Sequence, residues 1–331
     1  MSDKTELEKT VRQENIKGFV TPSDALSELD DSMFTPPHHK QKVYGALEAG
    51  GTKMVCALGD AGGRILEQRS IPTTTPEETM PRIIEYFADK EIAALGIGCF
   101  GPIDVHRDSP DWGMILDTPK LPWRHFNIVR ALSDALQVPA GLDTDVNGSL
   151  LGEVTYGSAK GLKDVVYITI GTGIGAGIMT GGQLLHGTLH PEAGHMHMRI
   201  LDDDTYQGKC PYHRTCFEGM ASGPAIAERW GAPGRELTDR PEVWETEAGY
   251  IAQAISSLAM ILSPERFILG GGVMHQEQLF PLIRQKVTED IAGYIHTPQI
   301  DDMEHYIVPA SLGDDQGIMG AVKLAIEAER V

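Results

Sequence analysis

Two glycine-rich turns, each lying between a pair of strand-like segments, restrict the fold of this chain more than any other feature. The turns read EAGG at 48–51 and GTGIG at 171–175. Short apolar runs bounded by such turns are typical of strands, and helical spacing follows later in each half. The strand segments are 43–47 and 52–58 around the first turn, and 165–170 and 176–180 around the second. The repeated order predicts a duplicated α/β unit with a cleft between the two copies.

The rest of the chain supplies the elements of two domains, as its 331 residues suggest. Further strands are expected at 64–70, 92–99, 138–142 and 267–269, and helices at 77–89, 147–153, 250–262 and 318–328. We expect a small α/β domain over 43–157, joined by the C-terminal helix 317–331, and a large α/β domain over 158–316. Residues 1–42 hold eight acidic and six basic residues and few aromatic ones, which is typical of a mobile extension.

The charge and hydropathy of the chain exclude several classes of protein. Acidic residues number 47 against 28 basic ones, and a net charge of −19 repels nucleic acid and anionic membranes. The longest uncharged stretch, 165–186, is broken by glycines, and the first forty residues hold no signal peptide. We therefore expect a cytoplasmic protein with no membrane span. Four cysteines are too few for a disulfide scaffold, and Cys56 and Cys99 are expected to be buried thiols.

Glycine is abundant, at 37 residues, and the two turns suggest a reason. Without Cβ atoms, successive backbone N–H groups can approach and cradle phosphate oxygens, so two such turns across a cleft could hold a polyphosphate. The alternative is that both turns are only tight hairpins. Residues 171–176 also fit the dinucleotide pattern G-x-G-x-x-A, but that motif must open a helix and a strand follows here. A P-loop is absent because Thr52 precedes Lys53.

A pair of carboxylates follows the predicted strand 138–142. Asp143 and Asp145 lie in the sequence DTDVN, before a predicted helix. Carboxylates at the carboxyl ends of strands in α/β sheets face the ligand crevice, and one aspartate there suits a general base that accepts a hydroxyl proton. The alternative role for either aspartate is the N-cap of the helix, where Asp is favoured.

Residues 195–216 carry a group of potential metal ligands. Cys210, His213 and Cys216 lie within seven residues, and His195 or His197 could complete a set of four. Nitrogen and sulfur donors in a tetrahedral set suit Zn²⁺, and a zinc with four protein ligands is structural because no position stays open for water. The alternative is a chance grouping of thiols and histidines in a loop.

Together these motifs resemble the ROK family of sugar kinases and regulators, most closely its bacterial zinc-containing fructokinase branch. The matching segments are EAGGTK at 48–53, ILDTPKLPW at 115–123, DTDVN at 143–147, the run 169–195, the zinc loop 210–219 and LGDDQG at 312–317. Glu48 stands where many members have Asp, and His213 where many have a third cysteine; both changes fit the fructokinase branch. Thr144 replaces an Asn often found in the family.

The resemblance implies an actin-like, hexokinase-like fold of two ribonuclease H-like domains that close on ATP and sugar. It implies an ATP-dependent fructokinase, which transfers the γ-phosphoryl group of ATP to the 6-hydroxyl of D-fructose, with Mg²⁺ bound to ATP, structural Zn²⁺ and a homodimer. A mannose or glucose kinase of the same family is the alternative. An alternative of another class is a ROK sugar-responsive transcriptional regulator, but residues 1–42 are too short for its winged helix.

The resemblance also implies roles for individual residues, with Asp145 as the general base. The expected ATP contacts are Gly50, Gly51, Thr52, Lys53, Gly171, Thr172, Gly173, Gly223, Pro224, Gly270, Gly271 and Gly272. The expected sugar contacts are Gly101, Thr144, Asp145, Glu192, His195 and Glu218, and the expected zinc ligands are His195, Cys210, His213 and Cys216. His195 would bind zinc with one ring nitrogen and orient the sugar with the other. His197 is left as a strand-surface residue.

Overall fold

The computed structural model describes residues 42–330. Residues 1–41, which are nearly all of the predicted extension, and residue 331 lie outside the described part. The first described residue is Lys42, and its ammonium group lies 2.6 Å from a carboxylate oxygen of Glu329.

The first half of the described chain builds a five-stranded sheet in the order β3-β2-β1-β4-β5. The strands are β1 (Val43–Ala49), β2 (Lys53–Gly59), β3 (Ile65–Pro72), β4 (Ile92–Cys99) and β5 (Ala140–Thr144). The first three strands pair antiparallel, whereas β4 pairs parallel with β1 and β5 parallel with β4. All five strands were expected from the sequence, although β5 begins and ends two residues later than the apolar run at 138–142 predicted.

The second half repeats this topology strand for strand. Its sheet has the order β10-β9-β6-β7-β8, with β6, β7 and β8 antiparallel and β9 and β10 added in parallel. The strands are β6 (Val165–Ile170), β7 (Ile174–Thr180), β8 (Gln183–Leu184), β9 (Arg266–Gly270) and β10 (Ile307–Pro309). The predicted duplication of an α/β unit is therefore confirmed, and a strand does follow the second glycine turn. The sequence did not predict β8 and β10, which have two and three residues and are too short to show the alternation of apolar and polar residues typical of strands.

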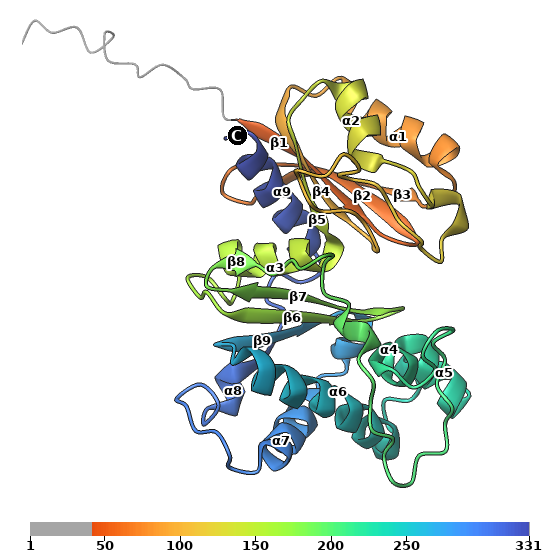
Figure 1. Ribbon diagram of the computed structural model, residues 1–331, viewed down its shortest axis with the longest axis vertical. Coiled ribbons are helices and arrows are strands. Elements are labelled where there is room, and N and C mark those ends of the chain that lie inside the picture. Colours follow the sequence, from red (N-terminus) through yellow and green to blue (C-terminus); the bar gives the residue numbers. More distant parts are fainter. Residues whose placement is uncertain (1–41, 331) are drawn as a thin grey trace, which may run out of the picture. The chain divides into compact units, whose positions relative to one another are not determined.

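Helices complete the layers on both faces of the two sheets. They are α1 (Pro76–Ala88), α2 (Ile128–Leu136), α3 (Asp145–Tyr156), α4 (Phe217–Ala221), α5 (Gly223–Trp230), α6 (Pro241–Leu262), α7 (Leu279–Ile291), α8 (Met303–Tyr306) and α9 (Gln316–Ala328). α3 and α9 pack on each other; α9 also packs on β1 and β4, and α3 on β7 and β6 (Figure 1). The C-terminal helix, predicted over 318–328 from its spacing and over 317–331 as part of the small domain, begins at Gln316 and ends at Ala328.

Alternation along β1 shows how the first sheet buries both of its faces. Leu47 and Ala49 belong to the core that also contains α1 and α2, whereas Tyr44 and Ala46 belong to the core under α9. Successive side chains of a strand point to opposite faces, so a strand covered on both sides is apolar throughout. The two sheets and their helices form the two-domain α/β architecture expected from the sequence.

Many glycines serve the packing of backbones rather than the approach to phosphate, which corrects the reason first given for their abundance. A Cβ atom on Gly96 of β4 would clash with the carbonyl oxygen of Ala321 in α9. A Cβ atom on Gly320 of α9 would likewise clash with the carbonyl oxygen of Gly148 in α3. These contacts let α9 lie directly against both β4 and α3. Close packing of backbones therefore explains part of the glycine content, beside the two turns.

A buried glutamate joins the end of α3 to the segment that leads into α9. Glu153 is fully buried, and its carboxylate accepts hydrogen bonds from the backbone N–H and hydroxyl of both Ser158 and Ser311. The N–H of Leu312 adds a fifth, at 3.2 Å. One carboxylate thus fixes two chain segments that connect the first half of the molecule to the second.

Replacing Glu153 by glutamine should lower the free energy of unfolding by about 2 kcal/mol, because a buried charged acceptor with several donors is lost. The measurement is urea denaturation. Glu327→Gln is the matched control, since Glu327 is exposed and pairs only with Lys323 one helical turn away, at 3.0 Å. That change should stay within about 0.5 kcal/mol. Equal effects of the two substitutions would contradict the bracing role of Glu153.

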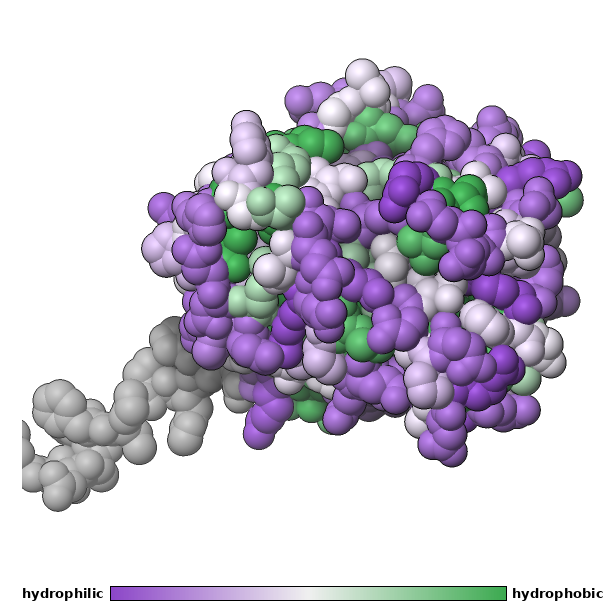
Figure 2. Space-filling model, turned by 90° about the horizontal axis from the view of Figure 1, so that it is seen from below, coloured by the Kyte–Doolittle hydropathy of each residue, from purple (hydrophilic) through white to green (hydrophobic). Residues whose placement is uncertain are grey.

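The surface carries no large apolar area on the face that Figure 2 shows, where hydrophilic residues predominate and hydrophobic ones are scattered. The exposed large hydrophobic residues of the described chain are Leu66, Leu121, Tyr212, Met260, Ile261 and Tyr294. Between residues 42 and 330, every helix is too short or too polar to span a bilayer.

Candidate active site and metal centre

Asp145 is the first residue of α3 and follows β5 directly. The cap of this helix is Thr144, whose hydroxyl accepts from the N–H of Asn147 at 3.2 Å, so neither aspartate takes the N-cap role considered from the sequence. The Asp145 carboxylate instead accepts from the N–H of Val146 at 2.9 Å. Asp145 therefore lies at the N-terminal end of α3, where the helix dipole is positive. Its second carboxylate oxygen takes no part in the hydrogen bond to Val146.

Asp143 has a different environment from Asp145. It is 4% exposed, and its carboxylate accepts from the side-chain amide of Asn147 at 2.6 Å and from the N–H of Thr144 at 2.8 Å. Its other oxygen lies 2.9 Å from Nε2 of His186. All of these contacts are structural, which leaves Asp145 as the aspartate available for chemistry.

Glycines on both sides of Asp145 bring it between the two sheets. A Cβ atom on Gly98 of β4 would lie 3.5 Å from the Asp145 Cα. A Cβ atom on Gly175 of β7 would lie 2.9 Å from a methyl group of Val146. The start of α3 thus touches one strand from each sheet, and Asp145 lies where the two halves meet.

The first glycine turn joins β1 to β2 at residues 50–52, because β1 continues through Glu48 and Ala49. The hydroxyl of Thr73 donates to the carbonyl oxygen of Gly50 at 2.8 Å, and the N–H of Thr73 donates to the carbonyl oxygen of Thr52 at 3.0 Å. Thr52 and Lys53 are exposed. The turn is anchored from behind while these residues face solvent, as a ligand-binding turn requires.

The second glycine turn lies beside the other segments expected to contact ATP. The N–H of Gly223 donates to the carbonyl oxygen of Gly171 at 2.8 Å, and a Cβ atom on Gly171 would lie 3.8 Å from the nitrogen of Gly272. Residues 171–173, 223–224 and 271–272 therefore form one surface. Gly270 differs from them, since it is the last residue of β9 and is buried under the hydroxyl of Tyr167.

Three of the expected sugar contacts, Gly101, Glu192 and Glu218, belong to one cluster with Asp145. A Cβ atom on Gly101 would lie 3.4 Å from a carboxylate oxygen of Glu192. The charge of Glu192 interacts with those of both Asp145 and Glu218. Glu218 also accepts from the N–H of Ile174 at 3.0 Å, so one carboxylate connects this cluster to the second glycine turn. Thr144 is the exception among the expected contacts, because it is buried with its hydroxyl engaged in the helix cap.

Burial and mutual repulsion make this cluster electrostatically unusual. Burial, with the nearby charge of Asp145, raises the pKa of Glu48 to about 7. Burial, with the charges of Glu218 and Asp145, raises the pKa of Glu192 to about 7. Burial also raises the pKa of Asp145 above its usual range. Groups with perturbed pKa values that share a site are characteristic of active sites.

The raised pKa of Glu48 predicts a pH-dependent stability. Between about pH 4.5 and 7 the folded protein holds a proton on Glu48 that the unfolded chain releases, so the Glu48 contribution to stability is lost as pH rises. Glu48→Gln should therefore raise the unfolding midpoint relative to the parent at pH 8, and the advantage should disappear by pH 4.5. Chemical denaturation at both pH values measures it. Glu78→Gln, at an exposed position of α1, is the control; a Glu48→Gln difference independent of pH would contradict the prediction.

The expected zinc ligands lie together. His195, Cys210, His213 and Cys216 each offer one ligand atom, and these atoms all lie within 4.8 Å of one another. Nδ1 of His195 lies 3.8 Å from the sulfur of Cys210 and 3.6 Å from that of Cys216. His197 lies outside the group and is exposed, as expected; a backbone bridge pairs it with Cys216, and its ring centroid lies 5.8 Å from that of His213.

The spacing of these four atoms fits a tetrahedral zinc ion. Bonds of about 2.3 Å to sulfur and about 2.05 Å to nitrogen place neighbouring ligands roughly 3.6 Å apart at tetrahedral angles. Three of the four sulfur–nitrogen distances measure 3.6 to 3.8 Å, and every pair of ligand atoms lies within 4.8 Å. Two thiols and two imidazoles are also the donor types that zinc prefers. Because Nδ1 of His195 faces the sulfurs, its Nε2 is left for another partner.

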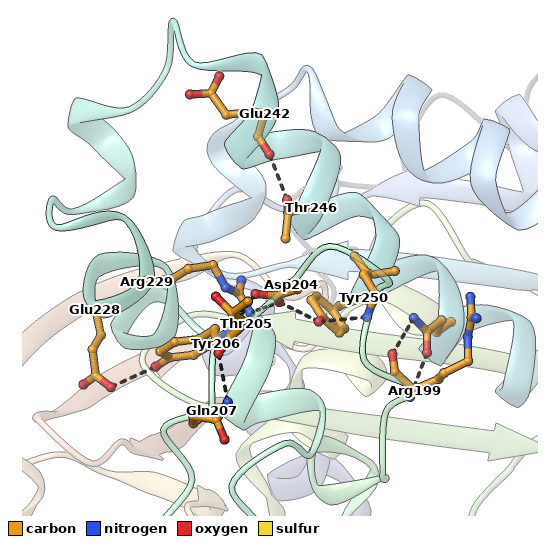
Figure 3. A network of polar contacts seen from close by, with 12 residues as sticks. Arg199, Asp204, Thr205, Tyr206, Gln207, Glu228, Arg229, Glu242, Thr246 and Tyr250 are labelled. Carbon is orange, nitrogen blue, oxygen red and sulfur yellow. Dashed lines mark hydrogen bonds and ion pairs between the residues drawn. The ribbon is translucent and has the colours of Figure 1, made fainter.

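A polar network fixes the segment that leads into the zinc loop (Figure 3). Asp204 accepts from the hydroxyl of Tyr250 at 2.6 Å and lies 3.1 Å from the Arg229 guanidinium. That guanidinium lies over the rings of Tyr206 and Tyr250, at 4.6 and 5.3 Å. The hydroxyl of Tyr206 donates to Glu228 at 3.1 Å. These contacts fix residues 204–206 to α5 and α6. The segment that precedes Cys210 is therefore held in position.

His190 is a residue of the site that sequence reasoning missed. It is buried, and its Nε2 accepts from the N–H of Ile103 at 3.2 Å while its Nδ1 lies 3.5 Å from Glu192. Burial lowers the pKa of His190, which keeps it neutral and able to accept. It therefore joins the loop containing Gly101 to Glu192. The sequence signal was a histidine inside the matching run 169–195, and nothing in the pattern distinguishes it from a surface residue.

Comparison with known proteins gives consistent results. The sequence model of the ROK family matches residues 44–328. The chain is 44% identical to a fructokinase of Pediococcus pentosaceus, over 86% of this chain and 97% of the relative, and 41% identical to a fructokinase of Zymomonas mobilis subsp. mobilis (strain ATCC 31821 / ZM4 / CP4), over 87% and 98%. Among solved structures, a ROK hexokinase from Thermus thermophilus superposes with a TM-score of 0.70 at 27% identity, covering 87% of this chain and all of the other.

Proposed function

This chain belongs to the ROK family, and we propose that it is an ATP-dependent fructokinase, which transfers the γ-phosphoryl group of ATP to the 6-hydroxyl of D-fructose. The observation that carries the choice of sugar is the 41 to 44% identity with two fructokinases over nearly their whole length. The decisive experiment compares kcat/KM for fructose, mannose, glucose and N-acetyl sugars in an ATP-dependent assay. Fructose should give the highest value, and a higher value for glucose or mannose would assign the chain to another sugar of the family.

Asp145 supports the proposed reaction as its general base. Its carboxylate accepts the proton of the 6-hydroxyl as that oxygen attacks the γ-phosphorus. The raised pKa of Asp145 makes its carboxylate a stronger proton acceptor than an exposed aspartate. The N–H of Val146 bonds one oxygen and thereby orients the other, so the base is positioned before substrate arrives.

The two glycine turns would hold the phosphates of ATP. The proposal places backbone N–H groups of residues 50–52 and 171–173 on the phosphate oxygens, with Lys53 beside them and Gly223, Pro224, Gly271 and Gly272 toward the adenosine. Mg²⁺ bound to ATP supplies neutralisation of phosphate charge during transfer. Glu48 is the acidic residue adjoining the first turn, and hard oxygen ligands of this type suit Mg²⁺.

The sugar would lie against Gly101, Glu192 and Glu218. Carboxylates accept from sugar hydroxyls, and the charge of Glu192, in the second half of the molecule, interacts with those of Asp145 and Glu218. Nε2 of His195 is available for a further hydroxyl because Nδ1 faces the cysteines. A zinc ion held by the four ligands would fix His195 as well as the loop, and so connect a structural metal to sugar geometry.

Three further features are part of the proposal. We place the small domain at 43–157 with the C-terminal helix, and the large domain at 158–316. A homodimer is expected, which light scattering coupled to size-exclusion chromatography tests. A cytoplasmic location follows from the sequence prediction and is tested by fractionation of cells.

A further inference from the structure

Lys120 lies in the segment 118–123, whose shape is fixed by a buried tryptophan. Trp123 is 1% exposed, and its indole N–H donates to the carbonyl oxygen of Thr74 at 2.8 Å. Its ring meets that of Phe100 edge to face, with centroids 6.1 Å apart. The N–H of Trp123 also donates to the carbonyl oxygen of Lys120, which closes a tight turn. The backbone of Lys120 is therefore held in one place.

The side chain of Lys120 extends to the first glycine turn. A Cβ atom on Gly51 would clash with the Lys120 Cε and would lie 2.8 Å from its Nζ. The ammonium group thus occupies space that any other residue at position 51 would fill. Its Nζ also lies 6.0 Å from the centre of the Phe100 ring, beside Gly101. Lys120 is consequently located between the turn proposed for phosphates and the loop proposed for sugar.

This ammonium group has no ion-pair partner among residues 42–330, although the site is rich in acid. The charge of Asp145 interacts with those of Glu48 and Glu192, the charge of Glu218 interacts with that of Glu192, and the pKa of both Glu48 and Glu192 is raised to about 7. A site of this composition opposes a polyanion such as ATP. Phosphoryl transfer depends mainly on positive groups directed at the oxygens of the transferred phosphoryl group. The ammonium group of Lys120 could supply such a positive charge.

From this geometry we propose that Lys120 is a catalytic residue that contacts the γ-phosphoryl oxygens during transfer; the inference rests on the proposed kinase function. In the reaction the sugar 6-oxygen forms its bond to the γ-phosphorus and gives its proton to Asp145. The bond from that phosphorus to the β,γ-bridging oxygen breaks, and its electron pair leaves with ADP. Lys120 stays protonated throughout and stabilises the negative charge on the three oxygens in transit.

The test compares Lys120→Met with Lys120→Arg. The control is Lys160→Met, which removes an exposed lysine that belongs to neither glycine turn. Lys120→Met should lower kcat for fructose about 100- to 1,000-fold, in line with the loss of one preorganised charge. The KM for fructose should change less than about threefold and the melting temperature should be unchanged. Lys120→Arg should recover roughly tenfold of the lost kcat, because it restores the charge with altered geometry. Lys160→Met should match the parent.

Binding of nucleotides gives a readout that needs no sugar. Calorimetry should show that Lys120→Met weakens binding of the non-hydrolysable ATP analogue AMPPNP at least tenfold more than binding of ADP. A kcat within threefold of the parent, or equal weakening of both nucleotides, would overturn the role of Lys120. Loss of kcat together with a lower melting temperature and no recovery in Lys120→Arg would do so as well. A parent protein that discriminates the two nucleotides through Lys120 but phosphorylates no sugar would instead overturn the proposed function.

Discussion

Asp145→Asn is expected to lower kcat about a thousandfold while both substrates still bind. Asparagine has the shape of aspartate and keeps an oxygen for the N–H of Val146, which now donates to Asp145 at 2.9 Å. It cannot take the proton of the sugar hydroxyl, and general-base catalysis contributes about 10²- to 10⁴-fold. Steady-state kinetics gives kcat, and calorimetry with fructose and with AMPPNP gives the two dissociation constants, which should change only a few-fold.

The pH profile separates this role from a structural one. In the parent, kcat/KM should fall on the acid side as Asp145 takes up a proton, at a pH above the usual range of an aspartate because burial raises its pKa. The residual activity of Asp145→Asn should lack this acid limb. Asp134→Asn, on the exposed side of α2, is the control and should behave as the parent. Near-normal turnover in Asp145→Asn would remove Asp145 from the role of base.

Loss of the metal centre has the second largest expected effect. Cys210→Ser should remove the zinc, lower the melting temperature and raise the KM for fructose by roughly tenfold or more, since His195 loses the ligand that fixes its ring. The KM for ATP should change much less, because the four ligands lie outside both glycine turns. Metal analysis of the purified protein, thermal melting and kinetics measure the three quantities, and chelation of the parent should reproduce them.

The matched control is another cysteine of the same chain. Cys56 is a buried free thiol in β2, far from the ligand group, and Cys56→Ala should keep one zinc per chain. Any effect of Cys56→Ala on stability then reports ordinary loss of packing. A parent protein that binds no zinc even when supplied with it would show that the four ligands hold no metal.

Much of the fold could be read from local sequence patterns. The glycine turns with their flanking strands predicted the antiparallel start of each sheet, and the second copy has the same strand order as the first. The helix α7 was missed although Leu279, Ile283 and Val287 have helical spacing, so its signal was present in the sequence. The helix α4 has five residues, too few for a period to emerge. Length therefore explains why α4 could not be predicted, but it does not explain why α7, with 13 residues, was missed.

The candidate site was predictable where one motif held all of its parts. Cys210, His213 and Cys216 lie within a single loop, the family resemblance chose His195 over His197, and the folded chain does bring His195 to the other three. Asp145 was one of two neighbouring aspartates, and the structure separates them because Asp143 is bonded to His186, which lies 43 residues away. Position within a motif could not reveal that partner.

Residue types and their spacing therefore predicted the duplicated α/β plan, the two glycine turns and the group of zinc-type ligands. These properties depend on groups a few residues apart, whose relative positions follow from backbone geometry alone. The packing of the chain decided which side chains share a site. Lys120 meets Gly51, His190 joins Ile103 to Glu192, and backbone contact explains Gly96 and Gly320. Each of these contacts joins segments distant in sequence, and only the path of the chain through two sheets and two central helices brings them together.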